Sequence, residues 1–308
     1  MGYVEKKSVN GKTYYYLTET KRVSGKWRKT RKYLGVHTPA GFEKPRRAKP
    51  KPILSETEKK IVELIKRNYN AEHELGPNLW KEKEERDRLV SFVFNTNAIE
   101  GNSLSLEETD SVLAGKKIAS AAKKEKDVRE AENMKECVDY LFSRVSKGKN
   151  ADLTEEMVLK LHEIEMQGVM PDAGAYRKVD VRVGSYYCPP HEEVGKLMRR
   201  FIEWYDEAKG VTPAFELAGL AHVRFVRIHP FRDGNGRVAR LVMNFLLIRN
   251  GFPFLNIFND DKLLYYLVLR KVDESKRFKP FVKYLFKVYA AQYKDYLKKE
   301  LRELKDSK

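Results

Sequence analysis

A glycine-rich loop between two helical patterns gathers residue types that bind phosphate groups. The loop, Gly234-Asn235-Gly236, lies just before the second pattern, where backbone N–H groups and the helix dipole favour an anion. Its two glycines let the backbone come close to phosphate oxygens. Arg237 and Arg240 share one face of the next turn, and guanidinium groups suit phosphate oxygens as paired donors. The spacing predicts a site for a polyphosphate.

Two side chains beside this loop add a metal ligand and a base. Asp233 directly precedes the glycines, and a carboxylate there suits Mg²⁺ rather than Zn²⁺. His229 ends the preceding helical pattern and is the nearby group that takes a proton near neutral pH. The chain has no GxxxxGK[ST] segment, so the site is not a P-loop. An ordinary turn between helices does not explain all these residue types at these spacings.

Residues 229–240, His-Pro-Phe-Arg-Asp-Gly-Asn-Gly-Arg-Val-Ala-Arg, resemble the signature of the Fic family at every defining position, and the resemblance covers roughly residues 55–290. It implies an enzyme that moves AMP from Mg-ATP onto a Ser, Thr or Tyr hydroxyl of a target protein, itself included. In Fic enzymes a base deprotonates the hydroxyl, which attacks the α-phosphorus of ATP and expels pyrophosphate. The resemblance assigns the base to His229, the Mg²⁺ ligand to Asp233, the anion hole to Gly234, Asn235 and Gly236, the β-phosphate to Arg237, the γ-phosphate to Arg240 and a core anchor to Phe231.

A second motif precedes the catalytic loop. Residues 96–101, Thr-Asn-Ala-Ile-Glu-Gly, resemble the inhibitory helix (S/T)xxxE(G/N) of the Fic class that carries this helix N-terminal to the core. Thr96, Glu100 and Gly101 stand at the defining positions. The resemblance implies that Glu100 pairs with Arg240 and takes the space of the γ-phosphate, which leaves ATP misaligned. Because breaking one side of a buried arginine–carboxylate pair costs about 3–5 kcal/mol, we expect a firm block.

Residues 176–187 interrupt the helical patterns. Valines alternate with polar residues and a turn follows at Gly184-Ser185, which predicts a β-hairpin that ends before Pro189-Pro190. Together with residues 174–177, this hairpin looks like the flap of Fic enzymes. The exposed edge of a flap can pair with an extended segment of the target, or the hairpin only closes the domain. The residues expected to dock the target are Lys178, Val179, Asp180, Val181, Arg182 and Val183.

Helical periodicity accounts for most of the chain from Ser55 onward. Capping boxes at Ser55 and Ser105 open two helices, and apolar residues at helical spacing indicate the others. We expect a mainly α fold: a Fic-type helical bundle with a β-hairpin flap, over residues 55–290, that includes the inhibitory helix at about 80–101. A C-terminal helix extension is expected over 291–308. The other predicted helices lie at about 105–115, 126–147, 152–164, 190–208, 213–227, 237–250, 260–272 and 278–304.

The N-terminal segment carries most of the charge. Residues 1–52 hold 15 Lys and Arg and 3 Glu, a difference of 15 − 3 = 12 out of a net charge of +17. Turn signals at Asn10-Gly11 and Ser24-Gly25 predict a small three-stranded β-module over 1–36, followed by a Pro-rich linker over 37–54. Aromatic residues among the charges favour stacking on nucleic acid, or else they pack on each other. The residues expected to contact nucleic acid are Arg28, Lys29, Arg31 and Lys32.

The composition of the chain indicates in which cellular compartment to expect the protein. The chain has no long apolar run and no secretory signal, and Cys137 and Cys188 suggest no disulfide framework, so we expect a cytoplasmic protein without a membrane partner. Two other functions stay open: removal of AMP by water that Glu100 orients, and nucleic-acid-binding regulation with an ATP-sensing Fic core. Gly236 argues against relatives that transfer phosphate, which tend to have lysine there. The target protein, the nucleotide base and a homodimer are also left open.

Overall fold

The computed structural model describes most of the chain. The described residues are 2–9, 12–23, 26–35, 51–73, 83–119, 122, 124–146, 148, 152–184, 186–275 and 277–297. The chain divides into two compact units, Met1–Lys51 and Pro52–Lys308, which are treated separately below. Among the described residues, no helix combines the length and the apolar composition that crossing a membrane requires.

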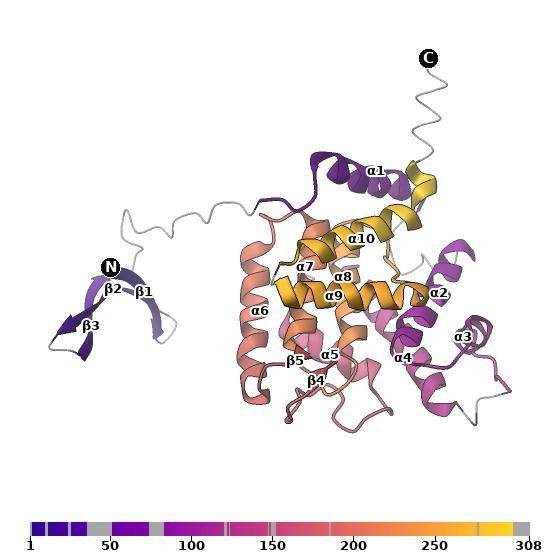
Figure 1. Ribbon diagram of the computed structural model, residues 1–308, viewed down its shortest axis with the longest axis horizontal. Helices are drawn as coiled ribbons and strands as arrows, with labels where there is room; N and C mark the ends of the chain where they lie inside the picture. The colour runs from indigo at the N-terminus through magenta and orange to yellow at the C-terminus, as the bar shows by residue number, and fades with distance from the viewer. Residues whose placement is uncertain are drawn as a thin grey trace, which may run out of the picture. The chain divides into compact units, whose positions relative to one another are not determined.

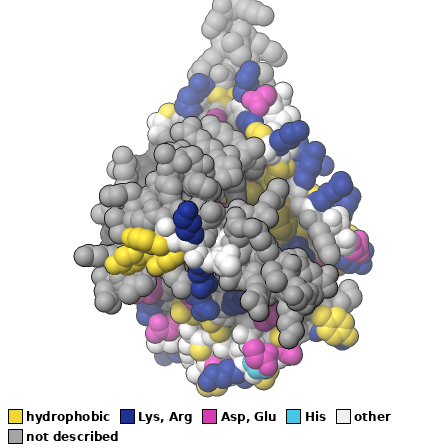
Figure 2. Space-filling view, turned by 90° about the vertical axis from the view of Figure 1, so that its left-hand side faces the viewer, with side chains coloured by type: hydrophobic (Ala, Val, Ile, Leu, Met, Phe, Trp, Pro, Cys, Tyr) yellow, Lys and Arg dark blue, Asp and Glu magenta, His cyan; other side chains and the backbone are white. Residues whose placement is uncertain are grey.

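The first unit is an antiparallel sheet in the order β1-β2-β3. Its strands are β1 (Gly2–Val9), β2 (Lys12–Val23) and β3 (Lys26–Gly35), so the three predicted strands are present. A bulge at Tyr15/Tyr16 shifts the register between β2 and β3. The predicted turns at Asn10-Gly11 and Ser24-Gly25, and the linker residues 37–50, lie outside the described residues. Figure 2 shows one side of the whole chain, where Lys and Arg side chains are scattered with Asp and Glu among them.

The second unit is a bundle of helices around α8, which confirms the mainly α fold (Figure 1). Helix α8 is buried along almost its whole length and contacts α2, α4, α5 and α7. The described helices are α1 (Glu56–Glu72), α2 (Lys83–Ile99), α3 (Leu106–Leu113), α4 (Glu125–Val145), α5 (Glu155–Glu165), α6 (Val194–Ala208), α7 (Ala214–Ile228), α8 (Asn235–Arg249), α9 (Lys262–Ser275) and α10 (Lys279–Gln292), with short 3₁₀ turns η4 (His191–Glu193) and η5 (Asn259–Asp261).

Side-chain caps start several of these helices where the sequence predicts them. Ser55 and Ser105 each accept a backbone hydrogen bond from the third helical residue, and the glutamate at that residue bonds back. Thr154 caps α5 in the same position. The predicted start of the inhibitory helix at about residue 80 lies outside the described residues, and α2 is described from Lys83. At the other end, α10 is described as Lys279–Gln292, residues 294–297 are again helical, and the rest of the predicted helix up to 304 lies outside the described residues.

The entry into the bundle is fixed by a buried glutamate. Glu216, near the start of α7, accepts hydrogen bonds from the backbone N–H groups of Ile53 (2.9 Å) and Leu54 (3.0 Å). Glu216 is 2% exposed and Leu54 is 4% exposed. Residues 53 and 54, which the sequence assigns to the linker, are therefore held against the helix that leads to the catalytic loop.

Candidate active site

The catalytic loop begins in a strained backbone conformation. Helix α7 ends at His229, whose φ of 52° and ψ of 59° lie in the left-handed region. Among the described residues other than glycine, His229 alone has a positive φ. Such a conformation costs about 1 kcal/mol or more for a residue with a Cβ, and it persists where neighbours hold it.

Arg177 holds this conformation. Its Nε donates to the carbonyl oxygen of His229 (2.8 Å), and its backbone N–H donates to the carbonyl oxygen of Pro230 (2.9 Å). The remaining guanidinium nitrogens donate to the carbonyl oxygens of Val179 (2.9 Å) and Pro189 (2.5 Å). Arg177 as a whole residue is 2% exposed. Arg177 thus ties the catalytic loop to both sides of the flap, a role that its position in the flap sequence did not reveal.

The loop is closed by the side chain of Asn235. Its Nδ2 donates to the carbonyl oxygen of Phe231 (2.8 Å), and its Oδ1 accepts from the N–H of Phe231 (2.9 Å). Phe231 is fully buried, as expected for a core anchor, and its ring stacks on His162 at 3.7 Å. Of the two glycines, Gly234 has a φ of 75°, which few other residues adopt. The N-terminus of α8 is therefore presented on a rigid loop.

His229 is set up to accept a proton. Its Nδ1 lies 3.3 Å from the carbonyl oxygen of Val226, and a hydrogen bond there assigns the proton to Nδ1 and leaves Nε2 as the base. Burial of the ring lowers the pKa of His229. The imidazole is therefore neutral near pH 7, which a general base requires.

The predicted contact between Glu100 and Arg240 is present. Glu100 Oε1 accepts a hydrogen bond from Arg240 Nη2 at 2.8 Å. Arg240 also donates from Nε to Thr96 Oγ1 (2.7 Å) and from Nη2 to the carbonyl oxygen of Thr96 (2.8 Å). Arg240 is 1% exposed, whereas the side chain of Glu100 is 26% exposed. Gly101 follows with a φ of 101°, which ends the helix beside the loop.

Arg237 is paired more heavily than the sequence predicts. Its Nε lies 2.9 Å from Glu165 Oε1 and its Nη1 lies 3.0 Å from Glu130 Oε1. Its Nη2 is 3.6 Å from Asp233 Oδ1. The side chains of Arg237, Glu130 and Glu165 are at most 6% exposed. Only Nη2 is directed toward the acid of the loop, so the two buried glutamates restrict how Arg237 can meet a phosphate.

Glu165 is an unusual neighbour for an anion-binding loop. A Cβ on Gly234 would lie only 2.6 Å from Glu165 Oε2, so the carboxylate lies directly against the turn. Burial raises the pKa of Glu165, whereas the guanidinium of Arg237 at 2.9 Å opposes this rise and favours the ionised carboxylate. The sequence held one signal for this residue, because Glu165 shares the apolar stripe of α5 with Leu161 and Val158. A charge on such a stripe indicates a buried partner.

We expect Glu165→Leu to lower the free energy of unfolding by about 3–5 kcal/mol, because it removes one partner of a buried ion pair. Glu165→Gln keeps an oxygen near Arg237 and is expected to lose less. Chemical denaturation measures both values. The control is Glu163→Leu on the same helix, whose exposed carboxylate pairs with Lys160 and whose loss is expected to change stability by about 0–1 kcal/mol. Equal losses at positions 163 and 165 would contradict the buried pairing.

His162 connects the start of the flap, at Gly174, to the loop that precedes α8. Its Nδ1 accepts from the N–H of Gly174 (2.9 Å), and its Nε2 donates to the carbonyl oxygen of Asp233 (3.2 Å). This arrangement needs the neutral ring, since a protonated Nδ1 cannot accept. Burial lowers the pKa of His162 to about 4, from an ordinary 6.5.

A lowered folded-state pKa means that the unfolded chain binds more protons below pH 6.5, so stability falls as the pH drops from 6.5 to 4. At roughly 1.4 kcal/mol per pKa unit, His162 contributes a loss of about 3 kcal/mol over that window. Denaturation at pH 7 and pH 4.5 should show a smaller loss in His162→Asn than in the wild type. The partly exposed His191→Asn serves as the control, and an unchanged pH dependence in His162→Asn would exclude this role.

The flap is shorter than the sequence predicts. Only β4 (Arg182–Val183) and β5 (Tyr186–Tyr187) pair, and residues 176–181 are not a strand, so that part of the prediction is wrong. The register would bring Pro189 and Pro190 opposite residues 180 and 179, and proline has no N–H to donate to a ladder. Of the six docking residues, Lys178, Val179, Asp180, Arg182 and Val183 are exposed and Val181 is half-buried.

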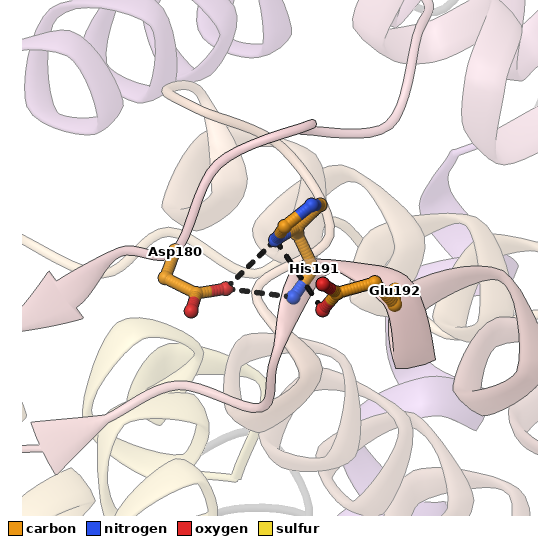
Figure 3. Close-up of side chains that lie close together, drawn as sticks. All are labelled: Asp180, His191 and Glu192. Carbon is orange, nitrogen blue, oxygen red and sulfur yellow. Dashed lines mark hydrogen bonds and ion pairs between the residues drawn. The ribbon is translucent and has the colours of Figure 1, made fainter.

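A cluster at the base of the flap contains the ligand types of a metal site. Asp180 Oδ1 accepts from both the backbone N–H (2.8 Å) and Nδ1 (3.0 Å) of His191, and Glu192 lies 3.4 Å from the same Nδ1 (Figure 3). These are the described residues that form such a group, and Asp233 is not among them. The hydrogen bonds account for the cluster: Asp180 fastens the flap to the start of α6, and the bond from His191 lowers its pKa.

Three tyrosine rings of the basic module lie near one another. Tyr33 on β3 lies against Tyr16 (5.5 Å between ring centroids) and Tyr14 (6.3 Å), so these aromatic rings pack on one another. Arg31 and Lys32 are exposed, while the side chains of Arg28 and Lys29 lie outside the described ones. Binding of nucleic acid by this unit stays a prediction.

Comparison with known proteins places the site within a family. Residues 152–247 match the family model described as Fic/DOC family. The chain is 28% identical over 253 residues to protein adenylyltransferase fic-1 of Caenorhabditis briggsae (82% of this chain, 50% of the relative). It is 31% identical over 202 residues to protein adenylyltransferase Fic of Nematostella vectensis (65% and 47%). The chain thus spans about half the length of the curated relatives it matches.

Solved structures show the same fold. A Fic domain containing signalling protein from Bacteroides thetaiotaomicron superposes with a TM-score of 0.68 at 27% identity, covering 77% of this chain and 96% of that one. A fragment of Fic-1 from Caenorhabditis elegans gives a TM-score of 0.66 at 26% identity, with 80% and 74% covered. These similarities extend well beyond the catalytic loop, over most of the helical unit.

Proposed function

Since this chain is a Fic-domain protein of the Fic/DOC family, we propose that it transfers AMP from Mg-ATP to a hydroxyl group of a protein and that Glu100 restrains this reaction. The observation that carries the proposal is the convergence, at the N-terminus of α8, of a neutral histidine, a glycine turn and two arginines, one of them paired with Glu100. The curated relatives named above are adenylyltransferases, which supports the same reaction.

The chemistry follows from the positions of these groups. His229 Nε2 removes the proton of the target hydroxyl, whose oxygen forms a bond to the α-phosphorus of ATP. The bond from that phosphorus to the leaving oxygen breaks, and pyrophosphate departs. Backbone N–H groups at the start of α8, together with the guanidinium groups, stabilise the negative charge that builds up on the phosphates. Most of the catalysis is thus positioning, for which a rigid loop is suited.

Asp233 suits the metal in this proposal. Its side chain is 56% exposed at the rim of the site, and Oδ1 is fixed by the N–H of Gly234 at 2.7 Å. An accessible carboxylate is the kind of oxygen ligand that Mg²⁺ takes from a protein. When bound there, Mg²⁺ neutralises charge on the phosphates.

The test uses ATP labelled at different positions. Incubated with α-labelled ATP and Mg²⁺, the protein is expected to become labelled on itself or on an added target. With γ-labelled ATP it is expected to stay unlabelled, because the γ-phosphate leaves in pyrophosphate. Label from the γ position would instead mean phosphate transfer and would contradict the proposal.

The carboxylate of Glu100 gives a reason to test the reverse reaction, the removal of AMP from a modified protein. Glu100 uses Oε1 for Arg240, and its side chain is partly exposed, so it can also orient water. A protein that already carries labelled AMP should then lose the label in the presence of the wild type but not of Glu100→Gly. Retention of the label with both would leave transfer as the supported reaction.

A further inference from the structure

A buried histidine on α7 has no part in the chemistry described above. His222 is fully buried, and its ring stacks on that of Phe281 with 4.5 Å between the centroids. Its Nε2 lies 3.0 Å from the hydroxyl oxygen of Tyr265, on α9. Burial lowers the pKa of His222 well below the ordinary 6.5, so the ring is neutral near pH 7. A neutral ring can accept the hydroxyl proton of Tyr265.

Tyr265 connects this histidine to Arg240. Tyr265 is 1% exposed, and Cζ of Arg240 lies 5.9 Å from the centroid of the tyrosine ring. Burial raises the pKa of Tyr265 to about 12, and the positive charge of Arg240 opposes this rise. A guanidinium group carries donors and no acceptor, so the hydroxyl meets it with its oxygen and gives its proton to His222. The negative end of the hydroxyl dipole is thereby turned toward Arg240.

The guanidinium of Arg240 keeps one nitrogen for another partner. Its Nε and Nη2 donate to Thr96 and Glu100. Among the described residues, Nη1 has no hydrogen-bond partner. A Cβ on Gly236 would lie 3.1 Å from this Nη1, so the nitrogen is directed at the start of α8. Nη1 is therefore the donor placed to meet a phosphate at this helix N-terminus.

The contacts of Arg240 come from separate helices. Thr96 and Glu100 both belong to α2, the helix that carries the predicted inhibition. Tyr265 belongs to α9, and its partner His222 belongs to α7. The contact between Tyr265 and Arg240 therefore does not depend on α2. It remains when Glu100 gives up Arg240, which is when ATP needs the guanidinium in a fixed position.

We propose that Tyr265, oriented by His222, is a positioning residue that keeps Arg240 directed at the γ-phosphate of ATP once Glu100 has withdrawn. The inference rests on the proposed function, in which Arg240 binds that phosphate. Neither Tyr265 nor His222 touches the nucleotide. Because ADP lacks the γ-phosphate, the pair contributes to the binding of ATP and not to that of ADP.

The test compares the binding of ATP and ADP by calorimetry with Mg²⁺. The protein carries Glu100→Gly, which frees Arg240, and His229→Asn, which prevents ATP from being consumed. Tyr265→Phe removes one hydroxyl group and should weaken ATP binding about tenfold, the effect of losing one contact to a charged group, and ADP binding less than about twofold. The control is Tyr289→Phe on α10, whose buried ring packs on Phe215, and it should change neither value.

A second variant tests the orienting role of the histidine. His222→Leu removes the acceptor at Nε2 and should also weaken ATP binding more than ADP binding. His222→Leu and Tyr265→Phe together should weaken ATP binding no more than Tyr265→Phe alone, because both act through one contact. Losses that add up in the double variant overturn the role given to His222.

Three results overturn the positioning role of Tyr265. They are equal binding of ATP and ADP before the substitution, an unchanged preference for ATP after Tyr265→Phe, and an equal loss for both nucleotides, which marks a purely structural residue. The proposed function fails separately, in the experiment with α-labelled ATP. If no AMP is transferred there but Tyr265→Phe still removes the preference for ATP, the positioning role stands and the transfer reaction does not.

Discussion

Glu100→Gly is expected to label itself from α-labelled ATP about 10–100 times faster than the wild type. The substitution removes a charge-assisted hydrogen bond to Arg240, a contact of the kind that contributes about 1.5–3 kcal/mol, and each 1.4 kcal/mol corresponds to tenfold in rate. Arg240 then becomes available to the γ-phosphate. Its remaining bonds to Thr96 keep it in place, so the fold should survive the change.

The comparison with Glu100→Gln separates charge from shape. Glutamine fills the same space and keeps one oxygen toward Arg240, so it is expected to be activated less than glycine. ATP binding, measured separately by calorimetry, should change little in either variant. If Glu100→Gly binds ATP but transfers AMP no faster than the wild type, the ion pair does not restrain the reaction.

Replacing His229 should reduce AMP transfer about 10²–10⁴-fold, the usual contribution of a positioned general base. Alanine at this position meets a second difficulty, because its φ of 52° is left-handed and strains most residues. Asparagine tolerates that conformation and cannot act as the base. His229→Asn is therefore the sharper variant: the same 10²–10⁴-fold loss of activity with unchanged thermal stability assigns the role to the ring.

The pH dependence gives an independent check on His229. Because burial lowers the pKa of the ring, the base is already deprotonated near pH 7. The rate in Glu100→Gly should be level from about pH 7 upward and fall as the pH drops below the ordinary histidine range, about 6.5. A rate that keeps rising through pH 8 would point to another titrating group.

The sequence predicted what lies close together along the chain. The loop between His229 and Arg240 is contiguous, so the order of its residues alone was enough to interpret its glycines, acid and arginines. Glu100 and Arg240 are far apart in sequence, and their contact was predicted through family resemblance. For Glu165 the only signal was its place on the apolar stripe of α5, and nothing pointed to Glu130, because acids on a charged helix such as α4 are common and their burial depends on packing.

In the flap the sequence predicted a longer strand than the structure has. Alternating valines at positions 179, 181 and 183 favoured a long strand, yet tertiary contacts decide the outcome. Arg177 donates to the carbonyl oxygen of Val179, and the prolines opposite residues 179 and 180 supply no donors. The pairing therefore ends where the N–H of Cys188 donates to the carbonyl oxygen of Val181 (3.3 Å). Alternation alone could not reveal which backbone groups were already bonded.

Arg177 also determines which parts of the flap can vary. Its acceptors at positions 179, 189 and 229 are all backbone carbonyl oxygens, which any sequence provides. The tip between these anchors carries the exposed side chains of Val183 and Tyr187. The residues at the tip can therefore be changed to bind a different substrate protein, while the hydrogen bond from Arg177 to the carbonyl oxygen of His229 is kept.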